Sequence, residues 1–285
     1  AANLKFNFKS WEACRDLVSV QFEDDFGVRS WSLPRPHLIP PLANRLNYLC
    51  YVHDLLERDG RVGAGQDVAR ADDDATPGTR IQILDVGCGA NIVYPLLAAS
   101  YFRWRCVGCD VNGVALAHAA GIRDANPDIS PLILLREASG LGALRDVPYV
   151  DASVCNPPFF DSDVGELAGQ NPRTDYGGTR LEMWCSGGEE AFVLGLIRES
   201  KVYRDRCGWF STMVGKKKTL RVATAALAGG EEGGGGGDEG EGEAEGAVTH
   251  RIRALEQGIT TRWVLAWRWR ERERERERTD DGTTR

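Results

Sequence analysis

The stretch ILDVGCGA, residues 83–90, decides the fold of this chain. An apolar, β-branched run over residues 81–86 predicts a buried strand, and the glycines that follow predict a tight turn into a helix over residues 91–100. Glycines at such a turn let the backbone approach a ligand closely, and nucleotide-type cofactors bind outside the carboxyl end of such a strand. Glycine turns after strands are also common where no ligand binds. The motif alone therefore leaves both a cofactor site and a plain turn open.

Strand-like and helix-like segments alternate after this stretch. We expect helices over residues 113–121 and 189–201, and strands over residues 104–111, 132–135, 147–155, 208–214 and 261–269. Such alternation is typical of a parallel sheet with crossover helices. The sequence therefore predicts an α/β fold of the Rossmann-like kind.

The N-terminal part reads as a helical lead-in. Apolar residues at helical spacing predict a helix over residues 11–27 that ends at Gly27, and a second helix is expected from Asn44 to about Glu57, after a proline-rich passage. The expected organisation has five parts: lead-in and linker over residues 1–80, catalytic core over 81–227, a disordered Gly/Glu insertion over 228–247, a strand region of the core over 248–270, and a charged tail over 271–285.

The net charge leaves the partner open. The 285-residue chain has a formal charge of −7, and seven acidic side chains between Glu231 and Glu245 account for all of it. Phosphate binding depends on where Lys and Arg cluster rather than on their total. No apolar run approaches the roughly 20 residues of a membrane-spanning helix, and the N-terminus lacks a signal-peptide pattern. We expect a soluble intracellular protein of the nucleus and/or cytoplasm, with no membrane partner.

The eight cysteines lie mostly within apolar runs, which favours reduced core residues over a disulfide framework. Cys106 and Cys109 form a single CxxC pair, with no second pair and no histidine at ligand spacing. This pattern favours core positions on a buried strand over a zinc or redox site. No metal cofactor is expected.

Asp110 follows the next predicted strand, 25 residues after Asp85. In dinucleotide folds an acid about 20 residues beyond the glycine turn binds the ribose hydroxyls, and S-adenosylmethionine carries the same ribose diol. Asp110 is therefore predicted to bind a ribose. The alternative is that Asp110 only caps the helix that begins near Gly113.

The most specific motif is Asn156-Pro157-Pro158-Phe159, at the end of a later strand. The amino group of adenine is a poor nucleophile because its lone pair is delocalised into the ring. An Asn side-chain carbonyl and the backbone carbonyl of the following Pro can accept its two N–H groups and direct the lone pair toward a methyl carbon. Proline stiffens the turn, and Phe159 can stack on a base that has left its helix. The alternative is a proline-rich loop with no such role.

Taken together, these motifs resemble the methyltransferase-like protein 16 family, the U6 small nuclear RNA N6-adenine methyltransferases, whose bacterial relatives modify an adenine of 23S ribosomal RNA. The resemblance runs from about Leu4 to Trp269, with a gap at the acidic insertion. The segments that carry it are residues 25–27, 44–48, 85–90, 94–97, 155–160, 171–173, 187–189, 213–217 and 261–267.

This resemblance implies a Rossmann-like S-adenosylmethionine-dependent methyltransferase that forms N6-methyladenosine in a structured RNA, such as a U6-like or ribosomal hairpin. It implies cofactor contacts at Arg45, Gly87 and Asp110 and a further one near Ser139 or Gly140. The glycine-turn motif adds Asp85 and Gly89 to the predicted cofactor-binding residues. Asn156, Pro157, Pro158 and Phe159 would hold the target adenine. The family's basic upstream segment has no counterpart in this sequence, so a fragment with weaker RNA binding is expected. The loop after Leu135 lacks the lysines of some family members, so no cofactor-gating role is expected for it, and no C-terminal RNA-binding extension follows Trp269.

The best candidates for RNA contact form a basic cluster after the strand over residues 208–214. They are Lys216, Lys217, Lys218 and Arg221, together with Arg173 and Arg262. Such residues bind phosphates without reading sequence. A solvated surface cluster is the alternative for these residues. For the chain as a whole, methylation of another amine or amide, such as DNA adenine or protein glutamine, and a non-catalytic RNA-binding role also remain open.

Overall fold

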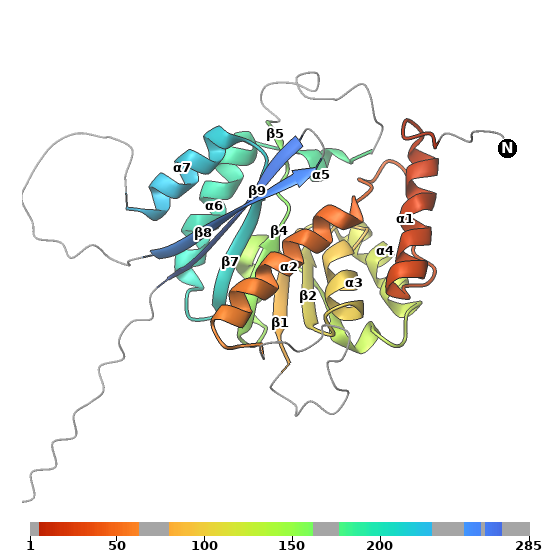
Figure 1. Cartoon of the computed structure of the whole chain (residues 1–285), viewed down its shortest axis with the longest axis horizontal. Coiled ribbons are helices and arrows are strands. Elements are labelled where there is room, and N and C mark those ends of the chain that lie inside the picture. Colours follow the sequence, from red (N-terminus) through yellow and green to blue (C-terminus); the bar gives the residue numbers. More distant parts are fainter. Residues whose placement is uncertain (1–5, 63–79, 162–176, 230–247, 258–259, 270–285) are drawn as a thin grey trace, which may run out of the picture.

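The computed structural model describes residues 6–62, 80–161, 177–229, 248–257 and 260–269 of the chain. Seven of the described strands form one mixed sheet with the order β3-β2-β1-β4-β7-β9-β8 (Figure 1). These strands are β1 (Gln82–Val86), β2 (Arg105–Asp110), β3 (Ile133–Glu137), β4 (Val150–Cys155), β7 (Cys207–Val214), β8 (Val248–Gln257) and β9 (Thr260–Trp269). The first five pair in parallel, whereas β9 is antiparallel to both β7 and β8. The predicted α/β class is confirmed.

Helices cover both faces of this sheet (Figure 1). One apolar core contains residues of α1 (Trp11–Phe26), α2 (Leu42–Arg58), α3 (Val93–Ser100) and α4 (Gly113–Asp124). The other contains residues of α6 (Gly188–Val202), α7 (Lys217–Leu227) and the 3₁₀ helix η3 (Gly140–Arg145). Successive strand residues point to opposite faces. Ile83 and Cys106 thus join the first core, and Leu84 and Cys109 join the second.

This alternation decides between the two interpretations of the CxxC pair, core positions or a zinc or redox site. Cys106 and Cys109 are both free and buried, and they lie in separate cores on opposite faces of the sheet. The two thiols cannot share a metal ion or form a disulfide across the sheet. The prediction that they are core residues is confirmed.

The N-terminal helices pack directly on the sheet. Ser10 caps α1 by accepting a hydrogen bond from the Ala13 N–H, and Gly27 ends it with a φ of 65°. Trp11 and Phe22 of α1 are almost fully buried. Glycine adopts this left-handed conformation without the strain of a Cβ, so the sequence signal for the end of α1 was correct.

Several elements were not predicted individually. α7 begins directly at the lysine cluster, β8 forms the edge of the sheet, and β5 (Phe160–Asp161) pairs with β6 (Trp184–Cys185) in a two-stranded sheet. The predicted linker and charged tail, and residues 230–247 of the predicted insertion, lie outside the described residues. Within the described part, no helix is long and apolar enough to cross a bilayer.

The sheet order places a cofactor site. Strand order reverses at β1, with β2 and β3 on one side and β4 and β7 on the other. Ligands of open α/β sheets bind outside the carboxyl ends of the strands at such a reversal. The carboxyl ends of β1, β2 and β4 carry the glycine turn, Asp110 and Asn156 respectively, which brings the three predicted motifs to one edge.

Candidate active site at the carboxyl edge of the sheet

A cavity of about 310 Å³ lies at this edge. Its volume falls at the lower end of the roughly 300–1,000 Å³ typical of small-molecule sites. All seven residues predicted to bind the cofactor line it, and so do two of the four residues predicted to hold adenine: Arg45, Asp85, Gly87, Gly89, Asp110, Ser139, Gly140, Asn156 and Pro158. The fold therefore gathers predicted residues from five separate segments around one space.

The glycine turn after β1 depends on its glycines. Gly87 and Gly89 have φ values of 77° and 62°, in the left-handed region that side chains disfavour. The N–H groups of Gly87 and Cys88 both donate to the Cys109 carbonyl at 2.9 Å, which ties the turn to β2. Gly89 N–H donates to Oδ2 of Asp110 at 2.9 Å. The turn and the acid after β2 thus form one rigid corner of the cavity.

Asp110 is part of the cavity wall rather than a helix cap. Its Oδ1 accepts from Asn112 N–H at 2.8 Å, whereas the N-cap of α4 is Asn112, whose side chain accepts from Val114 and Ala115 N–H. The alternative reading of Asp110 as the cap is wrong. A carboxylate oxygen has two lone pairs, so each oxygen can accept one more hydrogen bond. The side chain can therefore still accept from ribose hydroxyl groups.

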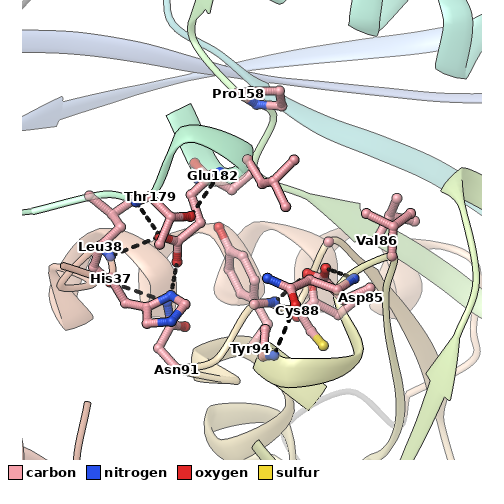
Figure 2. Close-up of a pocket in the computed structure, with 18 of the residues that line it drawn as sticks. His37, Leu38, Asp85, Val86, Cys88, Asn91, Tyr94, Pro158, Thr179 and Glu182 are labelled. Carbon is pink, nitrogen blue, oxygen red and sulfur yellow. Dashed lines mark hydrogen bonds and ion pairs between the residues drawn. The ribbon is translucent and has the colours of Figure 1, made fainter. Parts of the chain in front are cut away.

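Asp85 carries the strongest electrostatic signal of the site. It is 1% exposed, and both of its carboxylate oxygens are buried without a hydrogen-bond partner among the described residues. Burial raises the pKa of Asp85 well above its usual value, the Asp110 charge raises it further, and Arg45 opposes the shift. Figure 2 shows the side chain in the cavity, near Tyr94. A buried acceptor without a donor is costly, so the geometry suits a ligand that brings N–H or positive charge.

Arg45 connects the cofactor cavity to the Asn-Pro-Pro-Phe motif. Arg45 lies in the first turn of α2 and is 5% exposed. Its Nη1 donates to Oδ1 of Asn156 at 2.7 Å and lies 3.3 Å from the Tyr94 hydroxyl. A guanidinium only donates hydrogen bonds, so this contact fixes which end of the Asn156 amide is the oxygen. Sequence reasoning alone had no basis for this pair, which is 111 residues apart.

Only part of the Asn-Pro-Pro-Phe motif faces the cavity. Pro157 is buried and, like Phe159, is not among the residues that line the cavity, whereas Pro158 is. The Arg262 guanidinium lies 5.1 Å from the centre of the Phe159 ring. Phe159, the last residue of the motif, is thus held in a cation–π contact with Arg262, and its predicted stacking on a base remains a prediction.

A buried carboxylate organises the chain next to Arg262. Glu189 is 1% exposed and accepts hydrogen bonds from the N–H groups of Gly215 and Lys216. Arg262 donates to the Gly215 carbonyl at 3.3 Å, and burial lowers its pKa. Glu189 therefore fixes the turn from β7 into α7, which sets the position of the lysine cluster.

The other predicted RNA-binding residues are exposed. Lys216, Lys217, Lys218 and Arg221 lie at the start of α7, and only Lys218 has an ion pair among the described residues, with Glu190 at 3.2 Å. α7 has no side-chain N-cap. Positive side chains at a helix N-terminus face the positive end of the helix dipole, an arrangement that an anion stabilises. Arg173 lies outside the described residues.

Sequence reasoning missed one wall of the cavity. His37, Leu38 and Pro40 come from the proline-rich passage before α2, and Thr179, Leu181, Glu182, Trp184 and Cys185 come from the segment that contains α5 (Arg180–Met183) and β6. Figure 2 shows Glu182 and His37 pointing toward each other on this side. The prolines indicated an extended passage but gave no reason to place it at the site.

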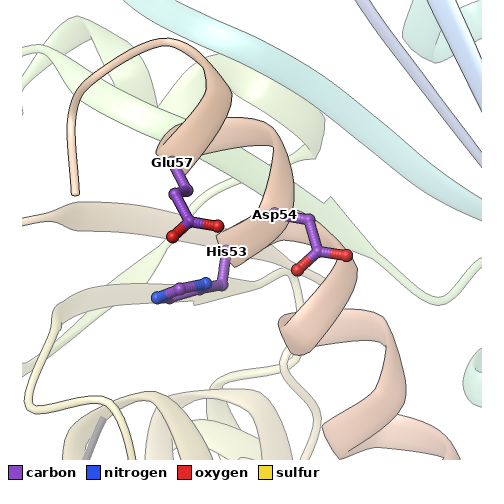
Figure 3. Close-up of side chains that lie close together, drawn as sticks. All are labelled: His53, Asp54 and Glu57. Carbon is purple, nitrogen blue, oxygen red and sulfur yellow. The ribbon is translucent and has the colours of Figure 1, made fainter. Parts of the chain in front are cut away.

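A separate cluster lies on α2, away from the cavity. The ligand atoms of His53, Asp54 and Glu57 lie within 4.8 Å of one another (Figure 3). His53 stacks on Trp104 at 6.2 Å between ring centres. None of the three lines the cavity, and they lie two to three turns along α2 from Arg45, so they take no part in the chemistry at the site.

The fold and cavity define a Rossmann-like enzyme that binds a nucleoside cofactor, and comparison with known proteins gives the family. A family model described as RNA methyltransferase matches residues 1–271. Ribosomal RNA large subunit methyltransferase F of Pseudomonas putida is 34% identical over 281 residues, with 92% of this chain and 80% of the relative covered. The protein of the same name from Bacteroides fragilis is 32% identical over 262 residues, which cover 85% of this chain and 79% of the relative.

Solved structures agree. The catalytic domain of human METTL16 in complex with the MAT2A 3′UTR hairpin 6 superposes with a TM-score of 0.71 at 27% identity, over 93% of this chain and 84% of that one. The N-terminal domain of human METTL16 in complex with SAH gives 0.64 at 27% identity, over 93% and 85%. The chain belongs to the RNA methyltransferase family, which confirms the resemblance predicted from its motifs.

Proposed function

We propose that this chain transfers the methyl group of S-adenosylmethionine to the N6 amino group of an adenine in structured RNA. The observation that carries the proposal is the position of Asn156. It lines the cavity that holds the glycine turn, Asp85 and Asp110, and its side-chain oxygen is fixed by Arg45. An amine-orienting carbonyl thus lies beside a nucleoside-binding corner, as methyl transfer from such a cofactor requires.

The charges of the cavity fit the cofactor. Among the described residues that line it, Asp85, Asp110 and Glu182 are acidic, and Arg45 and His37 are basic. A concave site with acidic walls attracts cations. S-adenosylmethionine supplies an electrophilic methyl group on a positively charged sulfur and also carries an ammonium group. Asp110 would accept from its ribose hydroxyls, and the unpartnered oxygens of Asp85 from its amino group.

Asn156 can serve the adenine at the same time as Arg45. Its Oδ1 accepts one hydrogen bond from Arg45 and has a second lone pair for an N6–H. The backbone carbonyl of Pro157 would accept the other N–H. Hydrogen bonding in this way keeps the nitrogen lone pair directed at the methyl carbon. The N6 nitrogen becomes strongly acidic once it is alkylated, so the proton leaves to solvent and the site needs no strong base.

The exposed lysines of α7 support RNA as the substrate. They follow the turn that Glu189 fixes. Arg262 contacts both this turn, at the Gly215 carbonyl, and Phe159 of the Asn-Pro-Pro-Phe motif. A phosphate backbone bound to the lysines would run past the motif that accepts the base. The METTL16 catalytic domain, whose fold this chain shares, has been solved with an RNA hairpin.

A substrate panel tests the proposal. Labelled S-adenosylmethionine would be supplied with RNA hairpins, single- and double-stranded DNA, and glutamine-containing peptides, and the modified product would be analysed after digestion. We expect label only in RNA, as N6-methyladenosine. Label in DNA or peptide would move the assignment to another amine or amide, and no label with any substrate would contradict a catalytic role.

A further inference from the structure

The Glu182 carboxylate joins two distant parts of the chain beside the cavity. Its Oε2 accepts from Leu38 N–H at 3.2 Å, and its Oε1 lies 3.2 Å from Nδ1 of His37, 145 residues away (Figure 2). Oε2 also accepts from Thr179 N–H at 2.7 Å. Three N–H groups from two segments therefore meet one carboxylate.

The two joined segments lie beside the glycine turn of the cofactor corner. His37, Leu38 and Asn91 form one wall, in which Asn91 Nδ2 donates to the Leu38 carbonyl at 3.3 Å. A Cβ added to Gly89 would lie 3.7 Å from Oε1 of Glu182, so the carboxylate sits directly over the glycine turn. Glu182 thus brings its own segment, residues 179–185, close to the glycine turn.

A purely local role does not explain these contacts. Glu182 and Thr179 form a capping box at the start of α5, which accounts for the contact with Thr179. It does not account for Leu38 and His37. α5 has no buried residues, and Leu181 is 64% exposed, so the segment adds little to the apolar core. What the cross-segment bonds do hold together is the wall of the cavity.

We propose that Glu182 is a positioning residue for cofactor binding: it ties residues 179–185 to His37 and Leu38, and so completes the cavity around S-adenosylmethionine. This inference rests on the proposed function. The residue need not touch the reacting atoms. It acts by holding two chain segments against the cofactor, which excludes water and slows release of the ligand.

The Glu182→Gln variant separates the role of Glu182 in the capping box from its contacts with His37 and Leu38. Glutamine serves a capping box as well as glutamate does. Its oxygen can still accept from Leu38 and Thr179, but its NH2 group then faces Nδ1 of His37 in place of an acceptor oxygen. The charge is lost, and the contact with His37 persists only if His37 moves its ring proton to Nε2. Loss of one hydrogen bond to a charged acceptor predicts a roughly tenfold rise in the Kd of S-adenosylhomocysteine by calorimetry. Glu23→Gln, the same change at an exposed position of α1, serves as the control with unchanged Kd.

Three further measurements decide the role. The KM for the cofactor should rise about as much as the Kd, while kcat at saturating cofactor stays within about twofold, since the reacting groups are intact. The melting temperature of the ligand-free variant should match that of the wild type. Combining Glu182→Gln with His37→Gln should add less than the two single effects do, because the two side chains act as one pair.

The outcomes separate this inference from the proposed function. No heat with wild-type protein would contradict the proposed function itself. Binding by wild type with an unchanged Kd in Glu182→Gln would overturn only the role of Glu182. A lower melting temperature without ligand, or a fall in kcat with unchanged Kd, would overturn it as well, because the first indicates a structural role and the second a role at the reacting groups.

Discussion

Asp85→Asn keeps the size of the side chain at the carboxyl end of β1 and removes its charge. Both carboxylate oxygens of Asp85 are buried and have no hydrogen-bond partner in the described part of the chain, and burial together with the Asp110 charge raises the pKa of Asp85. A buried unpaired polar group costs about 1–3 kcal/mol, and more when it is charged. The neutral amide should therefore stabilise the ligand-free protein by at least about 1 kcal/mol, or roughly 2–4 °C in Tm.

The sign of the pH dependence follows from the raised pKa. Unfolded chains lose the Asp proton near pH 4, whereas folded Asp85 keeps it to higher pH. Between the two pKa values the folded state binds more protons than the unfolded state, so wild-type stability falls as pH rises through this window. The gain in stability from Asp85→Asn should therefore be small near pH 4, grow through the window and become constant above the folded pKa.

Cofactor binding should change in the opposite direction. A bound cation favours the ionised form of Asp85, so the affinity of wild type for S-adenosylmethionine should rise with pH through the same window. The Asp85→Asn variant should bind it at least about tenfold more weakly at neutral pH, because the charge-assisted hydrogen bond is lost. Thermal unfolding and calorimetry across pH measure both effects. A variant less stable than wild type at every pH would refute the reasoning, since it would mean that Asp85 is already paired.

Three other substitutions probe the site. Asn156→Ala should lower kcat by about 10²–10³-fold and leave the Kd for S-adenosylhomocysteine within a few fold, because the lost contact is to adenine; unchanged turnover would remove Asn156 from the mechanism. Gly87→Ala should destabilise the protein by about 1–2 kcal/mol in chemical denaturation, since a Cβ there meets no atom within 4 Å and only the φ of 77° opposes it; a neutral effect would contradict that backbone conformation. Lys217→Ala should weaken binding to all RNA hairpins alike and reduce the slope of log K against log salt by about one, measured by fluorescence anisotropy; an effect on one sequence only would argue against phosphate contact.

Local signals predicted the centre of the fold and the cofactor corner. The apolar run of β1 and its glycines act over neighbouring residues, and the left-handed φ values at Gly87 and Gly89 are what the sequence implies for a tight turn. Asp110 was predicted from its spacing after the glycine turn, because an acid at the end of the next strand binds the ribose in dinucleotide folds. Asn156 followed from its chemistry at the end of a further strand.

Contacts between distant segments could not be predicted in the same way. The bond between Arg45 and Asn156 spans 111 residues, and that between His37 and Glu182 spans 145. No local pattern encodes either pairing, because each depends on how the proline-rich passage and the start of α2 lie across the finished sheet. Only the family resemblance drew attention to Arg45, and nothing did so for Glu182.

The start of α7 was missed for a different reason. Helix beginnings are recognised by Ser, Thr, Asp or Asn at the N-cap, whereas this helix has Lys216 there and lysines in its first turn. The helix forms because it packs Leu220, Ala223 and Leu227 into the second core. Tertiary packing thus overrides unfavourable end residues.

The most direct test of the account is a single-turnover reaction. Wild-type protein would be loaded with labelled S-adenosylmethionine, mixed with an excess of a structured RNA hairpin and quenched over time, and the nucleosides would be separated. The account predicts that label appears in N6-methyladenosine, and that Asn156→Ala binds the same amount of cofactor but transfers its methyl group at least about a hundredfold more slowly. Label in any other product, or equal rates for the two proteins, would contradict it.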